Sequence, residues 1–238
     1  MKARLVASAR VAEGTGGFTF EVEGPFTFDA GQACDITIPS PRYQDEKGTG
    51  RTFSMASPPA DAPRVMFATR LTGSAFKRTL LEAPVGLDVE IDGPSGSFVL
   101  HRNASKPAAF FAGGIGITPF RSIIGDAARR RLPHKLTLFY SNRTPESTAF
   151  LADLEAWQRE NPNFRLVATV AERSPKQAWN YDVGLLDAAF LRSSRRDWGE
   201  VICYLAGPPA FVKAMRAALE EVGADPDNVR TEEFDGYR

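Results

Sequence analysis

Apolar and polar residues alternate along the first hundred positions of the chain. Residues 18–23, 35–38 and 87–91 each place an apolar side chain at every second position, which is the period of a half-buried β-strand. Sequences rich in glycine and proline separate these segments, as at 14–17 and 93–96, and they indicate turns. Several short strands at this spacing predict a small antiparallel Greek-key β-barrel.

After residue 105 the pattern changes to apolar strands that alternate with segments of helical length. The expected strands cover 108–112, 135–140, 164–170 and 201–205, and the expected helices cover 119–131, 149–161 and 209–222. Such alternation forms βαβ units and a mostly parallel sheet. We therefore predict two domains, a β-barrel over residues 1–104 and an α/β domain over residues 105–238.

The composition is that of an ordinary globular protein. Lys plus Arg equals Asp plus Glu at 29 each, so no global charge attracts nucleic acid. Nowhere do about 18 apolar residues run together, and the first residues lack the apolar core of a signal peptide. We expect a soluble cytoplasmic protein with no nucleic-acid partner and no membrane insertion.

Two cysteines, Cys34 and Cys203, limit the metal chemistry of the chain. A zinc site or a [2Fe-2S] centre needs about four ligands, so two thiols alone hold neither, and no metal site is predicted. One disulfide is conceivable, but two buried thiols are the expectation for a reducing cytosol.

The first candidate binding segment is Arg51-Thr52-Phe53-Ser54. An arginine can pair with a phosphate, an aromatic side chain can lie against a flat ring, and a serine can hydrogen-bond the edge of that ring. This combination suits a flavin, with Ser54 reaching the flavin N5 atom. The alternative is an edge strand with an exposed arginine and a packed phenylalanine.

A second candidate is a short helix that begins near Ser74. Small residues here expose backbone N–H groups, which can bind a pyrophosphate. The alternative is a purely structural helix cap formed by Ser74. The candidate residues are Thr69, Gly73, Ser74 and Ala75.

A third candidate is a glycine-rich loop that follows one predicted strand and opens a predicted helix. Its glycines let the backbone approach a pyrophosphate, and the helix N-terminus supplies donors and a positive dipole. The loop lacks the G-x-G-x-x-G spacing, and a tight turn needed only for packing is the alternative. Its candidate residues are Gly113, Gly114, Gly116, Thr118 and Pro119.

A further loop, Gly207-Pro208-Pro209, follows the fourth strand of the second half. It is expected at the same carboxyl edge of the parallel sheet, where ligands bind in open α/β folds. Two such loops at one crevice favour a binding site for NAD(P)H.

Taken in order, these motifs resemble the ferredoxin-NADP reductase superfamily, specifically its compact bacterial members without fused domains. The resemblance covers essentially the whole chain. It implies a barrel that binds FAD, an α/β domain that binds NAD(P)H, and an active site between them. The motifs that carry it are Phe28-Asp29-Ala30-Gly31-Gln32, Arg51 to Ser54, Gly73-Ser74, Gly93-Pro94-Ser95-Gly96-Ser97-Phe98, Gly113 to Pro119, Gly207-Pro208-Pro209 and Glu232-Glu233-Phe234.

The resemblance also implies roles for particular residues. Arg51 and Ser74 would bind the flavin phosphate, and Phe53 and Ser54 would contact the isoalloxazine. The dinucleotide would be contacted by Gly113, Gly116 and Thr118. Phe234 would cover the flavin face and move aside for nicotinamide, so that the catalytic candidates are Ser54, Glu232 and Phe234.

Two positions depart from the pattern of many relatives. Ala206 stands where they place a cysteine before Gly-Pro-Pro, and Cys203 is expected to point elsewhere if its strand is regular. Phe53 stands where many have tyrosine, which keeps the ring contact and loses a hydroxyl hydrogen bond.

The choice between NADPH and NADH is expected to depend on Ser141 and Arg143, just after the second strand of the α/β domain. These side chains could hold a 2′-phosphate, which favours NADPH. The alternative is that Arg143 packs over adenine or faces solvent. His101 and His134 are interpreted as solvated surface residues rather than catalytic ones.

These inferences predict an FAD-dependent oxidoreductase that takes a hydride from NAD(P)H and passes electrons to a separate carrier. An acidic ferredoxin or flavodoxin could dock on the cations Arg42, Lys47, Arg70 and Lys77. One alternative is an NAD(P)H:flavin reductase that releases reduced flavin. Another is an electron-transfer subunit or redox-sensing module that depends on a partner for turnover.

Overall fold

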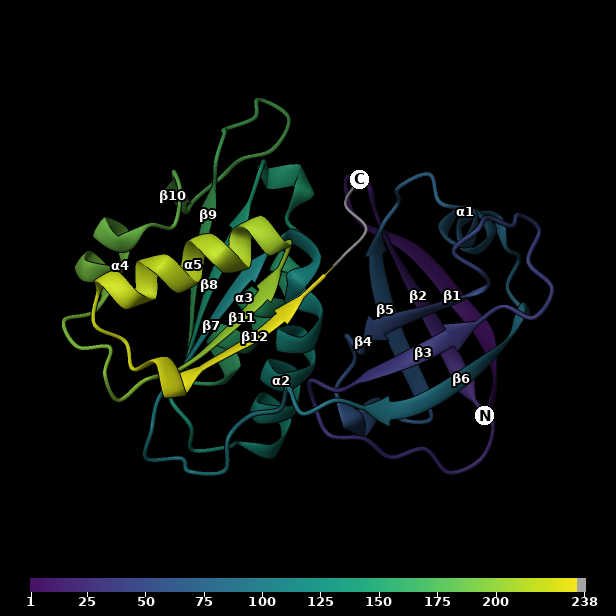
Figure 1. Ribbon diagram of the computed structural model, residues 1–238, viewed down its shortest axis with the longest axis horizontal. Coiled ribbons are helices and arrows are strands. Elements are labelled where there is room, and N and C mark those ends of the chain that lie inside the picture. Colours follow the sequence, from purple (N-terminus) through teal and green to yellow (C-terminus); the bar gives the residue numbers. More distant parts are fainter. Residues whose placement is uncertain (235–238) are drawn as a thin grey trace.

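A computed structural model of the chain, described over residues 1–234, contains two six-stranded sheets set side by side (Figure 1). The first sheet is antiparallel in the order β4-β3-β6-β1-β2-β5. Its strands are β1 (Lys2–Ala12), β2 (Thr15–Val22), β3 (Ala33–Thr37), β4 (Gly50–Ser54), β5 (Arg64–Arg70) and β6 (Asp88–Ser95). Helix α1 (Ala75–Glu82) follows β5.

The first sheet closes on itself, because the chain after β4 meets β5. There the Ala56 N–H donates to the carbonyl of Met66 at 2.7 Å. The alternating apolar residues of the strands point inward, so that Phe18, Phe20 and Ile36 are buried in one cluster. The predicted β-barrel is confirmed, and the hydrophobic alternation is the reason that it forms.

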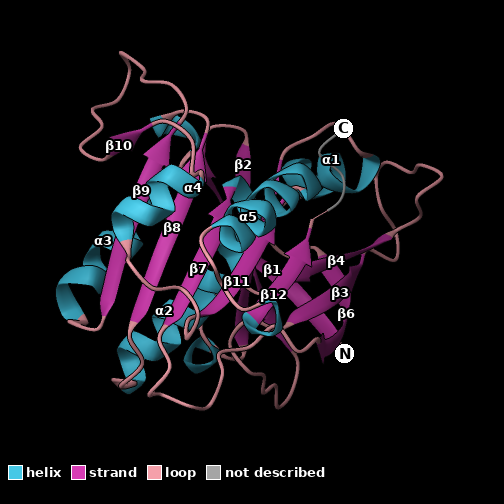
Figure 2. Ribbon diagram, turned by 60° about the vertical axis from the view of Figure 1, so that its left-hand side comes forward, coloured by secondary structure: helices cyan, strands magenta, loops and turns pink. Residues whose placement is uncertain are grey.

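The second sheet is parallel throughout, in the order β10-β9-β8-β7-β11-β12 (Figure 2). Its strands are β7 (Ala108–Gly113), β8 (Leu136–Asn142), β9 (Phe164–Val170), β10 (Asp182–Val183), β11 (Ile202–Gly207) and β12 (Val229–Glu233). Its helices are α2 (Ile117–Arg130), α3 (Leu151–Glu160), α4 (Ala188–Ser194) and α5 (Pro209–Glu221). The predicted mostly parallel α/β sheet is thus confirmed.

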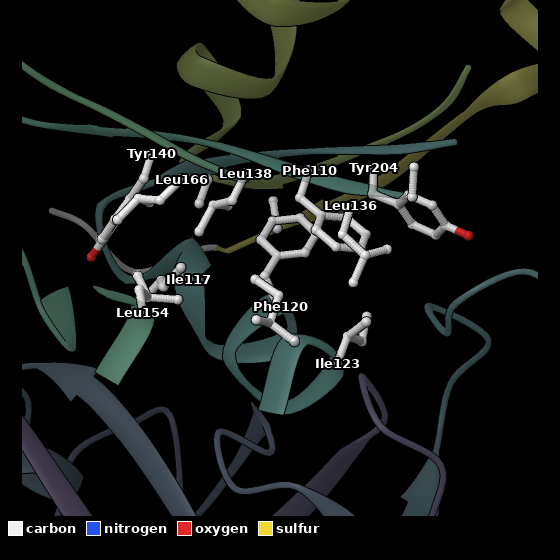
Figure 3. Packing of buried hydrophobic residues seen from close by; sticks show 14 of the residues in the cluster. Phe110, Ile117, Phe120, Ile123, Leu136, Leu138, Tyr140, Leu154, Leu166 and Tyr204 are labelled. Atoms are coloured by element: carbon white, nitrogen blue, oxygen red, sulfur yellow. The ribbon is translucent and has the colours of Figure 1, made fainter. Parts of the chain in front are cut away.

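Helices cover both faces of this sheet, which explains why its central strands are apolar without alternation. On one face Phe110 stacks on Phe120 of α2 with 5.0 Å between ring centroids, and Figure 3 shows the two rings meeting beside Leu138. On the other face Phe111 stacks on Phe139 at 4.9 Å, in the cluster that α4 and α5 complete.

The predicted boundaries hold to within a few residues. The expected strand at 164–170 coincides with β9, and the helix expected at 119–131 begins earlier, at Ile117, because a proline is tolerated in the first turn of a helix. Strand β12 was not predicted. Its sequence Val-Arg-Thr-Glu-Glu is polar and forms the edge of the sheet.

The expectation that both histidines are solvated is wrong for His134. Its side chain is buried, and Nε2 lies 2.8 Å from the carbonyl oxygen of His101. The half-buried His101 lies with Nδ1 at 3.1 Å from the Tyr204 hydroxyl. His101 belongs to the segment between β6 and β7 and packs against His134 with 5.2 Å between ring centroids, and the proposed boundary between residues 104 and 105 falls within that segment.

Helix α2 joins the second sheet to the barrel. The Arg121 guanidinium donates to the carbonyl of Ala56 at 2.7 Å, and the buried Ser122 hydroxyl donates to the carbonyl of Ser57, also at 2.7 Å. These contacts attach helix α2, which follows the first strand of the parallel sheet, to the chain that follows β4. Across residues 1–234, no helix combines the length and apolar character needed to cross a bilayer.

Candidate active site between the two sheets

A cavity of about 900 Å³ lies where β4, β5 and the start of α1 face the loop before α2 and the end of β12. This volume is typical of a small-molecule or cofactor site. The residues around it come from both sheets. They are Asp45, Glu46, Lys47, Arg51, Thr52, Phe53, Ser54, Ala68, Thr69, Arg70, Thr72, Gly73, Ser74, Lys77, Ile115, Thr118, Glu232, Glu233 and Phe234.

Strand β4 presents its four candidate residues to this cavity. The Phe53 ring is half-buried against Phe67 and Phe76, with centroids at 6.3 and 5.8 Å. The Arg51 guanidinium lies 5.4 Å from the centroid of Phe76, and its side chain is only 20% exposed. Arg51 is therefore mostly covered, while Phe53 is packed as in the alternative of an edge strand with an exposed arginine and a packed phenylalanine.

Helix α1 begins at the cavity wall, with Ser74 as its N-cap. The Ser74 hydroxyl accepts from the Lys77 N–H at 3.4 Å, so the structural cap considered for Ser74 is present. The Ala75 N–H donates outside the helix, to Asp45 Oδ2 at 3.0 Å. Thr69 and Gly73 also line the cavity.

Three of the cations assigned to a docking surface, Lys47, Arg70 and Lys77, instead line the cavity. Burial lowers the pKa of Lys77, and the positive charges of Arg51, Lys47 and Arg70 lower it further. Their grouping was hidden in the sequence because they lie on three separate segments. The Arg42 guanidinium lies 3.0 Å from a Glu82 carboxylate oxygen, and neither residue lines the cavity.

Ser54 and Glu232 meet at the cavity although they are 178 residues apart. The Ser54 hydroxyl donates to Glu232 Oε1 at 3.0 Å, while Glu232 Oε2 is buried without a hydrogen-bond partner in the described structure. Burial raises the pKa of Glu232 to about 7, and the Ser54 hydrogen bond opposes that rise. A carboxyl group in this state holds or releases a proton near neutral pH.

Strand β12 positions both Glu232 and Phe234. Pairing with β11 sets Glu232 opposite Ala206, and beyond the strand the Phe234 N–H donates to the carbonyl of Gly207 at 2.9 Å. Ile115, just before α2, and Thr118 in its first turn also line the cavity. The three catalytic candidates therefore share one cavity.

The two glycine loops touch one another at the carboxyl edge of the parallel sheet. A Cβ atom at Gly116 would lie 2.1 Å from the carbonyl oxygen of Ala206, and one at Gly207 would lie 3.0 Å from that of Gly113. The expected convergence of the loops is therefore present. Of the candidate residues, those outside the cavity lining are Ala75, Gly113, Gly114, Gly116, Pro119, Ser141, Arg143, Gly207 and Pro208.

Ser141 and Arg143 lie at the carboxyl end of β8 and just beyond it. The Arg143 side chain is 80% exposed and lies 3.8 Å from a Glu172 carboxylate oxygen. It therefore faces solvent at the sheet edge, one of the alternatives considered for it.

Neither cysteine is placed for chemistry in the cavity. Cys34 and Cys203 are free and buried, as expected from the sequence. Burial raises the pKa of each thiol to about 12, so both remain protonated and unreactive at neutral pH.

Sequence reasoning missed Asp45, which contacts both Arg51 and the start of α1. Its carboxylate lies 3.3 Å from an Arg51 guanidinium nitrogen. The surrounding sequence, Asp-Glu-Lys-Gly-Thr-Gly, indicates only a turn. No sequence signal distinguishes Asp45 from an ordinary loop aspartate.

Comparison with known proteins bears on both halves of the chain. Residues 110–217 match the family model described as the oxidoreductase NAD-binding domain. The chain is 26% identical over 208 residues to reductase component 1 of terephthalate 1,2-dioxygenase from Comamonas sp. It is 31% identical over 208 residues to the electron transfer component of toluate 1,2-dioxygenase from Pseudomonas putida.

Each of these alignments covers 87% of this chain and 59% of the relative, so the chain spans less than two thirds of their length. Among solved structures, the ferredoxin-NADP+ reductase from Plasmodium falciparum superposes with a TM-score of 0.77 at 17% identity, covering 98% of this chain and 95% of that one. This similarity establishes a shared fold over both sheets.

Proposed function

We propose that this chain is an FAD-dependent oxidoreductase. The premise is that it belongs to the ferredoxin-NADP reductase superfamily. It takes a hydride from NAD(P)H and passes electrons to a separate acceptor. The observation that carries the proposal is the shared cavity, in which the β4 residues of the barrel face Thr118 and Glu232 of the second sheet. A hydride donor and a hydride acceptor bound by the two sheets would meet there.

The residues around the cavity fit a flavin. Arg51, Arg70 and Lys77 supply positive charge for phosphate groups, and the half-buried Phe53 supplies an apolar wall for a flat ring. The unpartnered Oε2 of Glu232 is a buried polar atom that a ligand or water can satisfy. When bound, FAD would supply the redox chemistry, because none of the side chains around the cavity can accept a hydride.

The two touching loops fit a pyridine dinucleotide. Gly113 and Gly207 are buried against each other and against Phe211, whereas the half-buried Gly114 has open space at its α-carbon. The N-terminal end of α2 reaches the cavity at Thr118, and Ile115 lines it just before the helix. Backbone N–H groups at such an end favour phosphate groups. The match of residues 110–217 to the oxidoreductase NAD-binding domain supports this role.

In this proposal, Ser54 and Glu232 hold a proton at the centre of the site. The Ser54 hydroxyl orients Glu232 Oε1, and the raised pKa of Glu232 allows its carboxyl group to be protonated near pH 7. The pair therefore tunes the polarity of the cavity without acting as a nucleophile. Phe234, held by Gly207, covers the cavity and moves aside when nicotinamide enters.

We place the acceptor outside these 238 residues. The names of the two relatives describe a reductase component and an electron transfer component of dioxygenases. The 238 residues hold two cysteines, too few for a four-cysteine cluster. We infer an acceptor such as a small acidic ferredoxin or flavodoxin, and a cytoplasmic location consistent with the two free thiols.

The test is an anaerobic titration of the purified chain. Its visible spectrum is recorded, and NADPH and NADH are added in separate cuvettes. Bleaching of a bound flavin band supports the proposal and identifies the preferred nucleotide. A colourless protein that reduces added flavin would favour a flavin reductase that releases its product, and a protein inert to both nucleotides would favour a subunit that depends on its partner.

Arg51→Ala is expected to weaken flavin binding by about ten- to a hundredfold, because it removes one charged contact to a phosphate. The fold should persist, since Arg51 lies on an edge strand. Flavin occupancy after gel filtration is the measurement, and circular dichroism monitors folding. The matched control is Arg64→Ala, which removes a barrel arginine that is 65% exposed; equal occupancy in the two variants would remove Arg51 from the site.

Arg143→Ala is expected to raise the KM for NADPH about tenfold and to leave the KM for NADH nearly unchanged. The reason is that only NADPH carries a 2′-phosphate for the guanidinium to bind. Steady-state kinetics with both nucleotides provide the measurement, with NADH as the internal control. A similar change in KM for both nucleotides would mean that Arg143 does not bind the 2′-phosphate.

A further inference from the structure

Asp45 forms a bridge between two groups that are suited to binding phosphate. Oδ1 lies 3.3 Å from the Arg51 guanidinium, and Oδ2 accepts from the Ala75 N–H at 3.0 Å. Oδ1 also accepts from the Lys47 N–H at 3.0 Å. One carboxylate therefore occupies the donors of an arginine and of a helix N-terminus together, as a bound phosphate would.

Arg51 does not need Asp45 to keep its orientation. Its Nη1 atom donates to the carbonyls of Lys47, Gly48 and Gly50 at 2.8, 3.0 and 2.6 Å. Three backbone acceptors from the same loop therefore hold one end of the guanidinium, and Asp45 contacts only the other end, at Nη2. Asp45 is therefore better explained as filling an anion-binding subsite than as holding the Arg51 side chain in place.

The charges around Asp45 also favour an exchange of anions. Lys47, Arg51, Arg70 and Lys77 line the same cavity, and their mutual repulsion contributes to the lowered pKa of Lys77. The Ala75 and Lys47 N–H groups and Arg51 lower the pKa of Asp45, so its carboxylate stays charged at neutral pH. A pyrophosphate carries more negative charge than one carboxylate and would neutralise this group of cations more completely.

We propose that Asp45 is an intramolecular occupant of the flavin phosphate subsite, and that the phosphates of FAD bind by displacing its carboxylate. This inference rests on the proposed function and adds a specificity determinant to it. The Asp45 side chain is 30% exposed and belongs to the loop between β3 and β4, so the carboxylate has solvent to move into. The affinity for FAD then includes the cost of releasing Asp45, whereas a flavin without phosphate escapes that cost.

The experiment compares FAD with riboflavin, which has no phosphate. Dissociation constants for the apoprotein are measured by flavin fluorescence for the wild type, Asp45→Asn and Asp45→Ala. Asp88→Asn is the matched control, because Asp88 is also an ion-paired barrel aspartate but is 72% exposed at Arg4 and lies outside the cavity lining. Thermal unfolding of each variant verifies that it is folded.

Both Asp45 variants should bind FAD about tenfold more tightly than the wild type, since a competing charged contact is gone. Their affinity for riboflavin should stay within about twofold, and Asp88→Asn should change neither affinity. Unchanged or weaker FAD binding in the Asp45 variants would overturn the inference, as would equal tightening for both flavins. If no form of the chain binds either flavin, the proposed function itself fails and the inference fails with it.

Discussion

Gly116→Ala is expected to prevent nucleotide binding and to destabilise the second sheet by about 3 kcal/mol. A Cβ atom at residue 116 would lie 2.1 Å from the carbonyl oxygen of Ala206 and 2.7 Å from the backbone nitrogen of Gly207. These are backbone atoms of β11, so no side-chain rotation relieves the clash. The backbone φ of Gly116 is −58°, which any residue can adopt, so the expected effect is purely steric.

Gly114→Ala is the matched control within the same loop. Gly114 has a φ of +54°, and a Cβ atom there would meet no other atom within 4 Å. It should therefore cost about 1 kcal/mol through backbone strain alone. Urea midpoints and the affinity for NAD(P)H are measured for both variants; equal losses, or wild-type nucleotide affinity in Gly116→Ala, would show that the two loops do not need this close contact.

Glu232→Gln is expected to make the protein more stable than the wild type at pH 8 by about 2 kcal/mol, and to bring little gain at pH 4.5. Burial raises the pKa of the folded-state carboxyl group to about 7 from an ordinary value of 4.5. The folded state therefore binds the proton more tightly than the unfolded chain does. The stability that this group contributes is fully present below pH 4.5 and is lost as the pH rises through 7.

Solvent at the mouth of the cavity weakens the effect of burial, so the expected gain in unfolding free energy at pH 8 is smaller than the full difference between the two pKa values would give. Urea unfolding of Glu232→Gln and of the wild type at several pH values provides the measurement. Glu233→Gln is the control, because it removes an exposed carboxylate at the next position. An identical pH dependence in Glu232→Gln and the wild type would mean that Glu232 is ionised and solvated in the folded protein.

These two predictions depend on different kinds of sequence information. The glycines of the loop after β7 stand out in the sequence, because they follow an apolar strand and precede a helix. The contact of Gly116 with Ala206 depends on the parallel pairing of β7 and β11. The alternation of strands and helices predicts a parallel sheet but does not say which strands are neighbours. Glu232 was a candidate only by resemblance, since the polar strand that holds it has no hydrophobic pattern.

The burial of His134 and the position of Lys77 illustrate the same limit. Both residues look like ordinary surface residues in the sequence, because exposed and covered polar residues have the same local pattern. His134 packs against His101 of the segment between β6 and β7. The packing of α1 beside β4 brings Lys77 to the cavity. These positions depend on how elements pack after they form.

The sequence by itself determined the two kinds of sheet, the positions of the strands and helices that it predicted and the loops rich in glycine, because periodicity and backbone freedom are local properties of the chain. Only the tertiary structure decided that Ser54 contacts Glu232, that Asp45 occupies the donors of Arg51 and Ala75, and that four cations line one cavity. Ser54 and Glu232 are 178 residues apart, and Asp45 is 30 residues from Ala75. The contact of Ser54 with Glu232 is set by the packing of the barrel against the parallel sheet, whereas the contacts of Asp45 and the grouping of the cations are set by packing within the barrel half, and no local pattern encodes either.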